Sequence, residues 1–166
     1  MPAIAQRITP FLWFDDQAEQ AVALYTSIFK NSKVLATTRY SKEAEQVAGR
    51  PAGSVMTIGF RLDGQEFTAL NGGPAFKFNE AVSLVVHCRS QEELDHYWDR
   101  LSEGGDPQAQ QCGWLKDRFG LCWQVVPDQL TELLSDPDPA KAGRTMAAML
   151  KMKKLDLPAL ERAAAG

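Results

Sequence analysis

The sequence predicts an α+β protein built from two βαβββ modules and a helical tail. Two apolar, strand-like runs, at 7–14 and 81–88, are each followed by a stretch with helical spacing of apolar residues, and then by further strand-like runs. We expect the first module over residues 4–74, the second over 79–127 and the tail over 128–166, all within one domain.

The first module begins with a run of β-branched and aromatic residues at 7–14, which is typical of a buried strand. Asp16 and Glu19 have the spacing of a capping box, and they predict a helix that begins there and continues to about Phe29. Three more strands are expected at 34–40, 55–62 and 66–70, with a tight turn at Asp63-Gly64 between the last two.

The second module repeats this order. An apolar strand at 81–88 is followed by a second capping box, Ser90 with Glu93, and by a helix that ends at Gly104-Gly105. Further strands are expected near 108–111, 113–116 and 121–126, and Pro127 ends the module. A ferredoxin-like βαββαβ arrangement competes with this interpretation, but it leaves too many strands unused.

The first copy is longer than the second, and the polar stretch 41–54 accounts for the difference as a loop insertion. After Pro127 the chain is expected to be helical over 130–134 and 140–150, with a last short helix capped by Asp156. Met146, Met149 and Leu150 give this tail an apolar face.

Composition excludes several classes of function. The net charge of −3 gives no electrostatic footprint for nucleic acid, and no apolar run approaches the roughly 20 residues that span a membrane. The first residues lack the pattern of an export signal. Cys88, Cys112 and Cys122 are odd in number and have no CxxC spacing, so we expect reduced thiols and a cytoplasmic protein.

Three segments carry a resemblance to a known family: ITPFLWFDDQAEQAVALYTSIF at 8–29, the junction Leu62–Leu84, and CGWLKDRFGLCWQVVP at Cys112–Pro127. Together the chain resembles PhnB-like proteins, a branch of the glyoxalase/bleomycin-resistance (vicinal oxygen chelate) superfamily, over nearly its whole length. Such proteins often carry the label 3-demethylubiquinone-9 3-methyltransferase. The resemblance implies paired βαβββ modules that form a cup for a small molecule.

In the wider superfamily the cup holds a divalent metal on His, Glu or Gln side chains from the first and last strands of each module. The resemblance places these positions at Thr9, Ser83, Gln124 and around 68–69. First-row metals prefer imidazole, carboxylate or thiolate donors, so we expect no metal and no cofactor. The methyltransferase label also lacks support, because no glycine-rich turn follows the first strand.

Alternation along the strands selects the candidate ligand-binding residues. The set comprises Thr9, Phe11, Trp13, Ser83, His87, Cys122 and Gln124. His87 could act as an acid or base, or lie as a hydrogen-bonded histidine at the rim; Cys122 could be a nucleophile or a small core residue. Trp123 has the opposite phase and is expected in the core.

These residues predict a small-molecule-binding protein of unknown ligand, without a catalytic metal. The alternative is an enzyme of unknown reaction that uses the same cup. Open sheet edges are usually covered in proteins, and we therefore expect a homodimer with two-fold symmetry.

Overall fold

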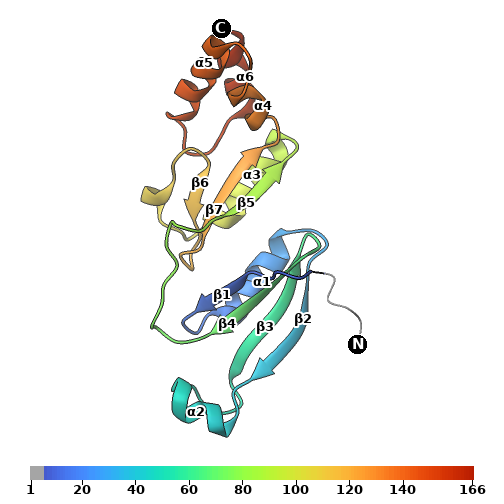
Figure 1. Cartoon of the computed structure of the whole chain (residues 1–166), viewed down its shortest axis with the longest axis vertical. Helices are drawn as coiled ribbons and strands as arrows, with labels where there is room; N and C mark the ends of the chain where they lie inside the picture. The colour runs from blue at the N-terminus through green and yellow to red at the C-terminus, as the bar shows by residue number, and fades with distance from the viewer. Residues whose placement is uncertain (1–5) are drawn as a thin grey trace. The chain divides into compact units, whose positions relative to one another are not determined.

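The structure is a computed structural model and describes residues 6–166. The expected start of the first module, at residue 4, lies outside the described residues. The chain divides into two compact units; the first ends at Phe78, and the second runs from Asn79 to Gly166. Each unit combines one small sheet with helices (Figure 1), which confirms the α+β class.

The first unit contains one sheet of four strands. Its elements are β1 (Phe11–Phe14), α1 (Ala18–Ile28), β2 (Lys33–Arg39), α2 (Lys42–Ala48), β3 (Val55–Leu62) and β4 (Gln65–Asn71). The strand order is β1-β4-β3-β2; β1 and β4 run parallel, and the other neighbours are antiparallel. The expected β3–β4 turn is confirmed, with Asp63 at φ 45° and Gly64 at φ 84°.

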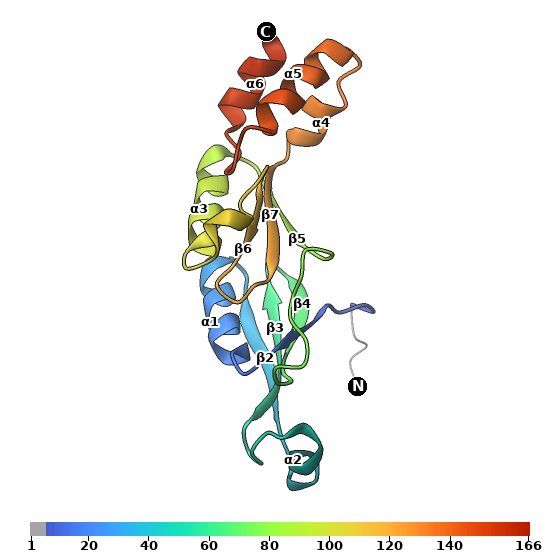
Figure 2. The same ribbon diagram turned by 90° about the vertical axis from the view of Figure 1, so that its left-hand side faces the viewer.

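Helix α1 covers one face of this sheet and leaves the other face open (Figure 2). Apolar side chains at helical spacing form its buried stripe: Ala18, Ala21, Val22, Tyr25 and Ile28. Every second residue of β3 and β4 points to the same side, including Ile58, Phe60 and Phe67, all of which are buried. The core of the first unit therefore lies between α1 and the sheet.

The expected capping box at Asp16 and Glu19 is wrong. The N-cap of α1 is Gln17, whose side chain makes no capping bond. Instead Asn71, at the end of β4, accepts a hydrogen bond from the Ala18 N–H at 2.9 Å through Oδ1 and donates to Glu19 Oε2 at 2.8 Å. A buried amide from a distant strand satisfies the helix end that a local carboxylate was expected to satisfy.

The second unit repeats the plan with one strand fewer. Its elements are β5 (Leu84–Cys88), α3 (Gln91–Ser102), a 3₁₀ turn η1 (Pro107–Ala109), β6 (Trp114–Lys116), β7 (Cys122–Pro127), α4 (Leu130–Leu134), α5 (Pro139–Met149) and α6 (Leu157–Ala165). The strand order is β5-β7-β6, with β5 parallel to β7. In both units the first strand therefore lies beside the last, in parallel.

The strand expected at 108–111 is wrong. Asp106 caps η1 by accepting from the Gln108 N–H, and Pro107 begins the turn. Within the described residues only an isolated bridge, Gln111 to Trp114, remains of that strand. Proline has no N–H to donate to a sheet, whereas its fixed φ suits the first turn of a helix.

The stretch 41–54 was expected to be a loop, and it contains helix α2. Ser41 caps α2 by accepting from the Ala44 N–H, and Gly49 ends it in the left-handed conformation at φ 65°. None of the residues of α2 is buried. The helix is therefore attached to the sheet without adding to the core.

The second capping box is confirmed: Ser90 Oγ accepts from the Glu93 N–H, and Glu93 accepts from the Arg89 N–H at 2.7 Å. The predicted cap of α6 is confirmed as well, since Asp156 accepts from the Ala159 N–H at 2.9 Å. Across the described residues, 6–166, no helix has both the length and the apolar composition needed to cross a membrane.

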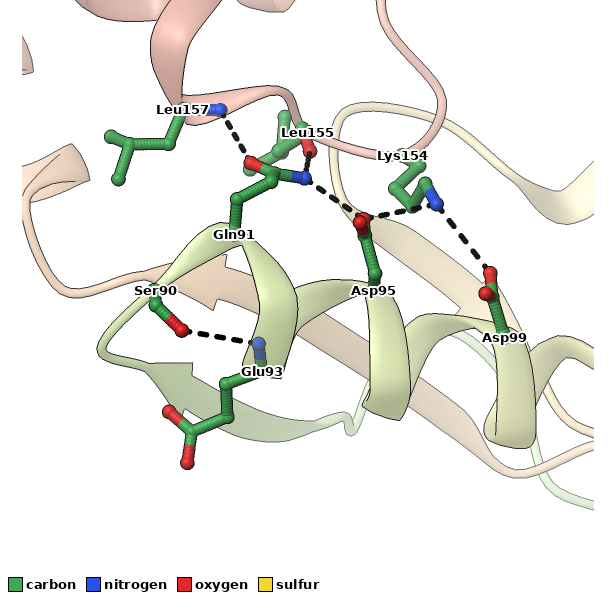
Figure 3. Close-up of polar contacts among 8 residues, drawn as sticks. All are labelled: Ser90, Gln91, Glu93, Asp95, Asp99, Lys154, Leu155 and Leu157. Carbon is green, nitrogen blue, oxygen red and sulfur yellow. Dashed lines mark hydrogen bonds and ion pairs between the residues drawn. The ribbon is translucent and has the colours of Figure 1, made fainter.

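The helical tail is joined to α3 by polar contacts (Figure 3). Gln91 accepts from the Leu157 N–H at 2.7 Å and donates to the Leu155 carbonyl at 3.0 Å. Lys154 forms ion pairs with Asp95 and Asp99. Leu155, Leu157 and Leu160 are buried beside these contacts.

Candidate functional site

The open face of the second sheet presents three of the candidate residues from the sequence, Ser83, His87 and Gln124. Helix α3 packs on the opposite face, where Trp123 is buried as expected and Val125 is buried beside it. Alternation along β5 and β7 leaves Val85, His87 and Gln124 partly or fully exposed on the open side. The two faces thus differ sharply, one being core and the other accessible.

Gln124 lies at the centre of this face. It is opposite Val85 on β5 and opposite Trp114 on β6 in the strand register. Its Nε2 donates a hydrogen bond to Ser83 Oγ at 2.9 Å, and both residues are half-buried. The structure therefore brings Ser83 and Gln124 together, in the phase that strand alternation predicted.

His87 lies on the same face, towards the end of β5. Its side chain is 70% exposed, and Nδ1 is 4.0 Å from Asp128 Oδ1. The register places it opposite Val126, two residues beyond Gln124. This is a rim position, in which solvent screens the interaction with Asp128.

Cys122 differs from its neighbours because it is only 2% exposed. It lies opposite Lys116, which forms an ion pair with Glu80. Burial raises the pKa of the Cys122 thiol above its ordinary value, although the Lys116 ammonium opposes the shift. The thiol is therefore protonated at neutral pH, and the arrangement does not provide an activated nucleophile.

Trp114 is a residue that the sequence reasoning missed. It is half-buried on β6, directly across from Gln124, so its ring adjoins the Ser83–Gln124 pair. The sequence of the hairpin could have identified it. Counting every second residue back from Gln124 through the Phe119-Gly120 turn reaches Trp114, which places the two on the same face.

The remaining candidates, Thr9, Phe11 and Trp13, lie in the first unit. Phe11 is 59% exposed and opposite Thr68, and Trp13 is half-buried and opposite Leu70. Leu12 and Phe14 point to the α1 side and are buried. Thr9 is exposed just before β1. Phe11 and Trp13 therefore share the open face of the first sheet.

The donor set at the positions implied for a metal does not fit a divalent ion. Those positions carry the hydroxyls of Thr9, Ser83 and Thr68 and the amide of Gln124, which is already bonded to Ser83. Ala69, the other residue considered, is fully buried on the α1 side. Among residues 6–166 no group of three or more His, Cys, Asp and Glu side chains is placed to hold a metal.

Comparison with known proteins agrees with this architecture. Residues 6–126 match the family model described as 3-demethylubiquinone-9 3-methyltransferase. No curated protein sequence gives a match.

Solved structures give the same picture. A putative 3-demethylubiquinone-9 3-methyltransferase, PhnB protein, from Bacillus cereus is 33% identical, with a TM-score of 0.62 over 74% of this chain and 99% of that one. Protein PA1353 from Pseudomonas aeruginosa is 20% identical, with a TM-score of 0.57 over 74% of this chain and 98% of that one. The fosfomycin resistance protein FosX from Listeria monocytogenes is 14% identical, with a TM-score of 0.53 over 78% and 96%, and shares the fold.

Proposed function

Because the chain belongs to the 3-demethylubiquinone-9 3-methyltransferase (PhnB-like) family of the vicinal oxygen chelate superfamily, we propose that it binds a small organic molecule on the open face of the second sheet. The observation that carries the proposal is the Gln124–Ser83 hydrogen bond on that face. Two polar side chains held together beside an aromatic ring provide both orientation and an apolar contact for a ligand.

The affinity would come from two sources. A ligand that hydrogen-bonds to the Ser83–Gln124 pair gains about 0.5–1.5 kcal/mol net for each bond. Burial of apolar ligand surface against Trp114, Val85 and Val126 adds about 25 cal/mol per Å². His87 lies at the rim, where it can meet a polar part of the ligand.

We include the open face of the first sheet in the same function. Thr9, Phe11 and Trp13 present there the aromatic and polar groups that suit a small molecule. Cys122 is buried, and its part in the proposal is to pack beneath the second face rather than to react.

Binding is proposed to be independent of metal, because the implied ligand positions carry hydroxyls and an amide. The family's name implies methyl transfer, and with it S-adenosylmethionine. The junction between β1 and α1, Asp15-Asp16-Gln17, has no glycine, and both sheets are mixed rather than doubly wound. These residues do not fit the usual binding turn for that cofactor, so no step through it is derived.

An enzyme that uses the same face is the second candidate. His87 supports it as an exposed imidazole 4.0 Å from Asp128. A His87→Gln variant would then lose turnover, with the pH dependence of the rate, and keep its ligand affinity. A variant that loses affinity and turnover in parallel would contradict a role in proton transfer.

The binding proposal is tested by screening a library of small polar aromatic compounds against ¹⁵N-labelled protein. We expect hits to shift the Gln124 side-chain amide and the Trp114 indole N–H. Gln124→Leu should weaken such hits about 2- to 10-fold, the value of one lost hydrogen bond. The matched control is Gln20→Leu, on the exposed side of α1.

Two results would contradict the proposal: hits whose affinity is equal in Gln124→Leu and wild type, or binding that disappears when a chelator is added. Loss of binding with the chelator would show that a metal ion takes part in ligand binding.

We further propose a homodimer, located in the cytoplasm. The open sheet faces and the edge strand β2, on which Val34 is 52% exposed, support pairing of copies. Three free cysteines suit a reducing compartment. A monomeric mass in light scattering at tens of micromolar protein would refute the dimer.

A further inference from the structure

The first unit contains a pocket separate from the Gln124 face. It has a volume of about 490 Å³, which falls within the usual range for small-molecule sites. Trp13 and Leu70 supply its floor from the open face of the sheet, and Tyr40 and the turn 72–75 supply its sides. Val47 and Ala48 of α2 form the remaining wall.

The polar hydrogens on the two rings of this pocket, the Trp13 N–H and the Tyr40 O–H, are already bonded to backbone carbonyls. Trp13 Nε1 donates to the Gly73 carbonyl at 2.9 Å, and the Tyr40 hydroxyl donates to the Asn71 carbonyl. The described residues that line the pocket carry no charge. The surface presented to an occupant is therefore ring carbon, methyl groups and backbone.

The floor is held in place before any ligand arrives. A Cβ on Gly72 would lie 2.4 Å from the Trp13 ring, so the indole lies directly against the Gly72 backbone. Phe76 contacts the same ring edge-on, with centroids 4.9 Å apart. A ring fixed on two sides binds a flat partner with little further loss of side-chain freedom.

Helix α2 does not contribute buried residues to the core of the first unit. It belongs to the insertion that the second unit lacks. Val47 is 92% exposed although its side chain borders the pocket. The insertion is nevertheless held: Tyr40 N–H donates to the Ser54 carbonyl at 2.9 Å, and Arg50 donates to the Asp15 carbonyl at 3.3 Å. Figure 1 shows α2 joined to the ends of β2 and β3.

We propose that this pocket is a second binding site, that it takes an uncharged aromatic ring compound, and that α2 is its specificity wall. The lining residues belong entirely to the first unit. The site therefore does not depend on the Gln124–Ser83 pair. Trp13 is shared with the first-sheet face included in the function proposed above, so the inference rests on that part of the proposal and deepens it by naming the ligand class and the helix that selects it.

Two fluorescent probes with the same ring skeleton test the ligand class. N-phenyl-1-naphthylamine is neutral, and 8-anilinonaphthalene-1-sulfonate adds a sulfonate. We expect the neutral probe to bind several-fold more tightly, because no lining side chain compensates a charge. Equal or tighter binding of the sulfonate would overturn the assignment to uncharged compounds.

Two variants of α2 test the site. Val47→Asp replaces an apolar contact on the pocket wall by a hydrated carboxylate and should weaken the neutral probe about 2- to 10-fold. Gln46→Asp adds the same charge to the adjacent exposed residue, which does not line the pocket, and should leave the affinity unchanged. Both positions are exposed, so both variants should fold with the wild-type melting temperature.

Equal effects of the two α2 variants would overturn the site, because they would show an effect of net charge alone. Gln124→Leu serves as the third arm. The neutral probe should bind to it as it binds to wild type; a loss there would place the probe on the second sheet and refute the separate pocket. Loss of library hits in Gln124→Leu, with probe binding kept, would leave both proposals standing.

Discussion

Gln91 and Leu157 join the helical tail to α3: the Gln91 side-chain oxygen accepts the backbone N–H of Leu157 at 2.7 Å (Figure 3). The same amide donates to the Leu155 carbonyl and to Asp95. One side chain therefore satisfies backbone groups on both sides of Asp156, the N-cap residue of α6.

Replacing Gln91 by Ala should loosen the tail. Two backbone groups lose their partner, and we expect the free energy of unfolding to fall by about 1–3 kcal/mol. Urea denaturation followed by circular dichroism measures this change. Glu92→Ala, on an exposed neighbouring position of α3, is the control and should change stability little. Equal losses in the two variants would show a general effect on the helix.

The Asp95–Lys154 ion pair, at 3.0 Å, should make stability depend on pH. Partial burial raises the pKa of Asp95, but hydrogen bonds from Gln91 and Lys154 outweigh it, and the net pKa is lowered. A carboxyl with a lowered folded-state pKa stabilises the fold above its unfolded pKa, about 3.9, and that contribution is lost as the pH falls through the folded value.

Asp95→Asn should therefore be less stable than wild type at pH 7, and the difference should shrink below about pH 4. The Asp95 side chain is 42% exposed, so solvent screening keeps the effect to at most about 1 kcal/mol. Urea midpoints measured from pH 7 to pH 3 give both quantities. A difference that stays constant over this range would show that the charge of Asp95 is not involved.

Gly72→Ala should disturb the Trp13 ring, because the added methyl would overlap it at 2.4 Å. Overpacking of this kind costs about 1–3 kcal/mol, and the indole N–H resonance of Trp13 should shift as its bond to Gly73 breaks. Gly143→Ala is the matched control: its Cβ meets nothing within 4 Å, and alanine in the middle of α5 should be neutral or stabilising.

The three thiols should differ in reactivity. Burial raises the pKa of Cys88 to about 12 and raises that of Cys122 as well, whereas Cys112 is partly exposed. Thiolate is the reactive form, so Ellman's reagent should label one thiol rapidly in the native protein and three after unfolding. Cys112→Ser should abolish the rapid phase. A rapid phase that survives in this variant would show that a buried cysteine becomes accessible.

Patterns confined to one element were sufficient to predict most of the fold. β3 was predicted at 55–62 and α4 at 130–134, and the structure has these bounds. The phase of β7 also followed from alternation, and with it the burial of Trp123 and the meeting of Gln124 with Ser83. Such features depend on neighbouring residues, which a sequence displays directly.

Features that depend on distant partners could not be predicted. The side chain that caps α1 is that of Asn71, more than fifty residues away. Asp16 has the capping-box spacing to Glu19, but it does not cap the helix. Helix α2 lay in a stretch read as loop, since it has no apolar stripe to give the usual signal. The pocket in the first unit is lined by Trp13, Tyr40 and Val47, which come from three separate segments of the chain. A pattern within one segment therefore could not predict it.

The hydrogen bonds between Tyr40 and residues 53–54 also have a use in protein engineering. The Tyr40 N–H donates to Ser54 and the Tyr40 carbonyl accepts from Gly53 at 2.8 Å, so the two ends of the α2 segment already lie at hairpin distance. The segment between them can therefore be cut out and replaced by a two-residue β-turn without moving either strand. We expect the same junction to accept loops of other lengths, so that the first unit could serve as a scaffold with an exchangeable loop.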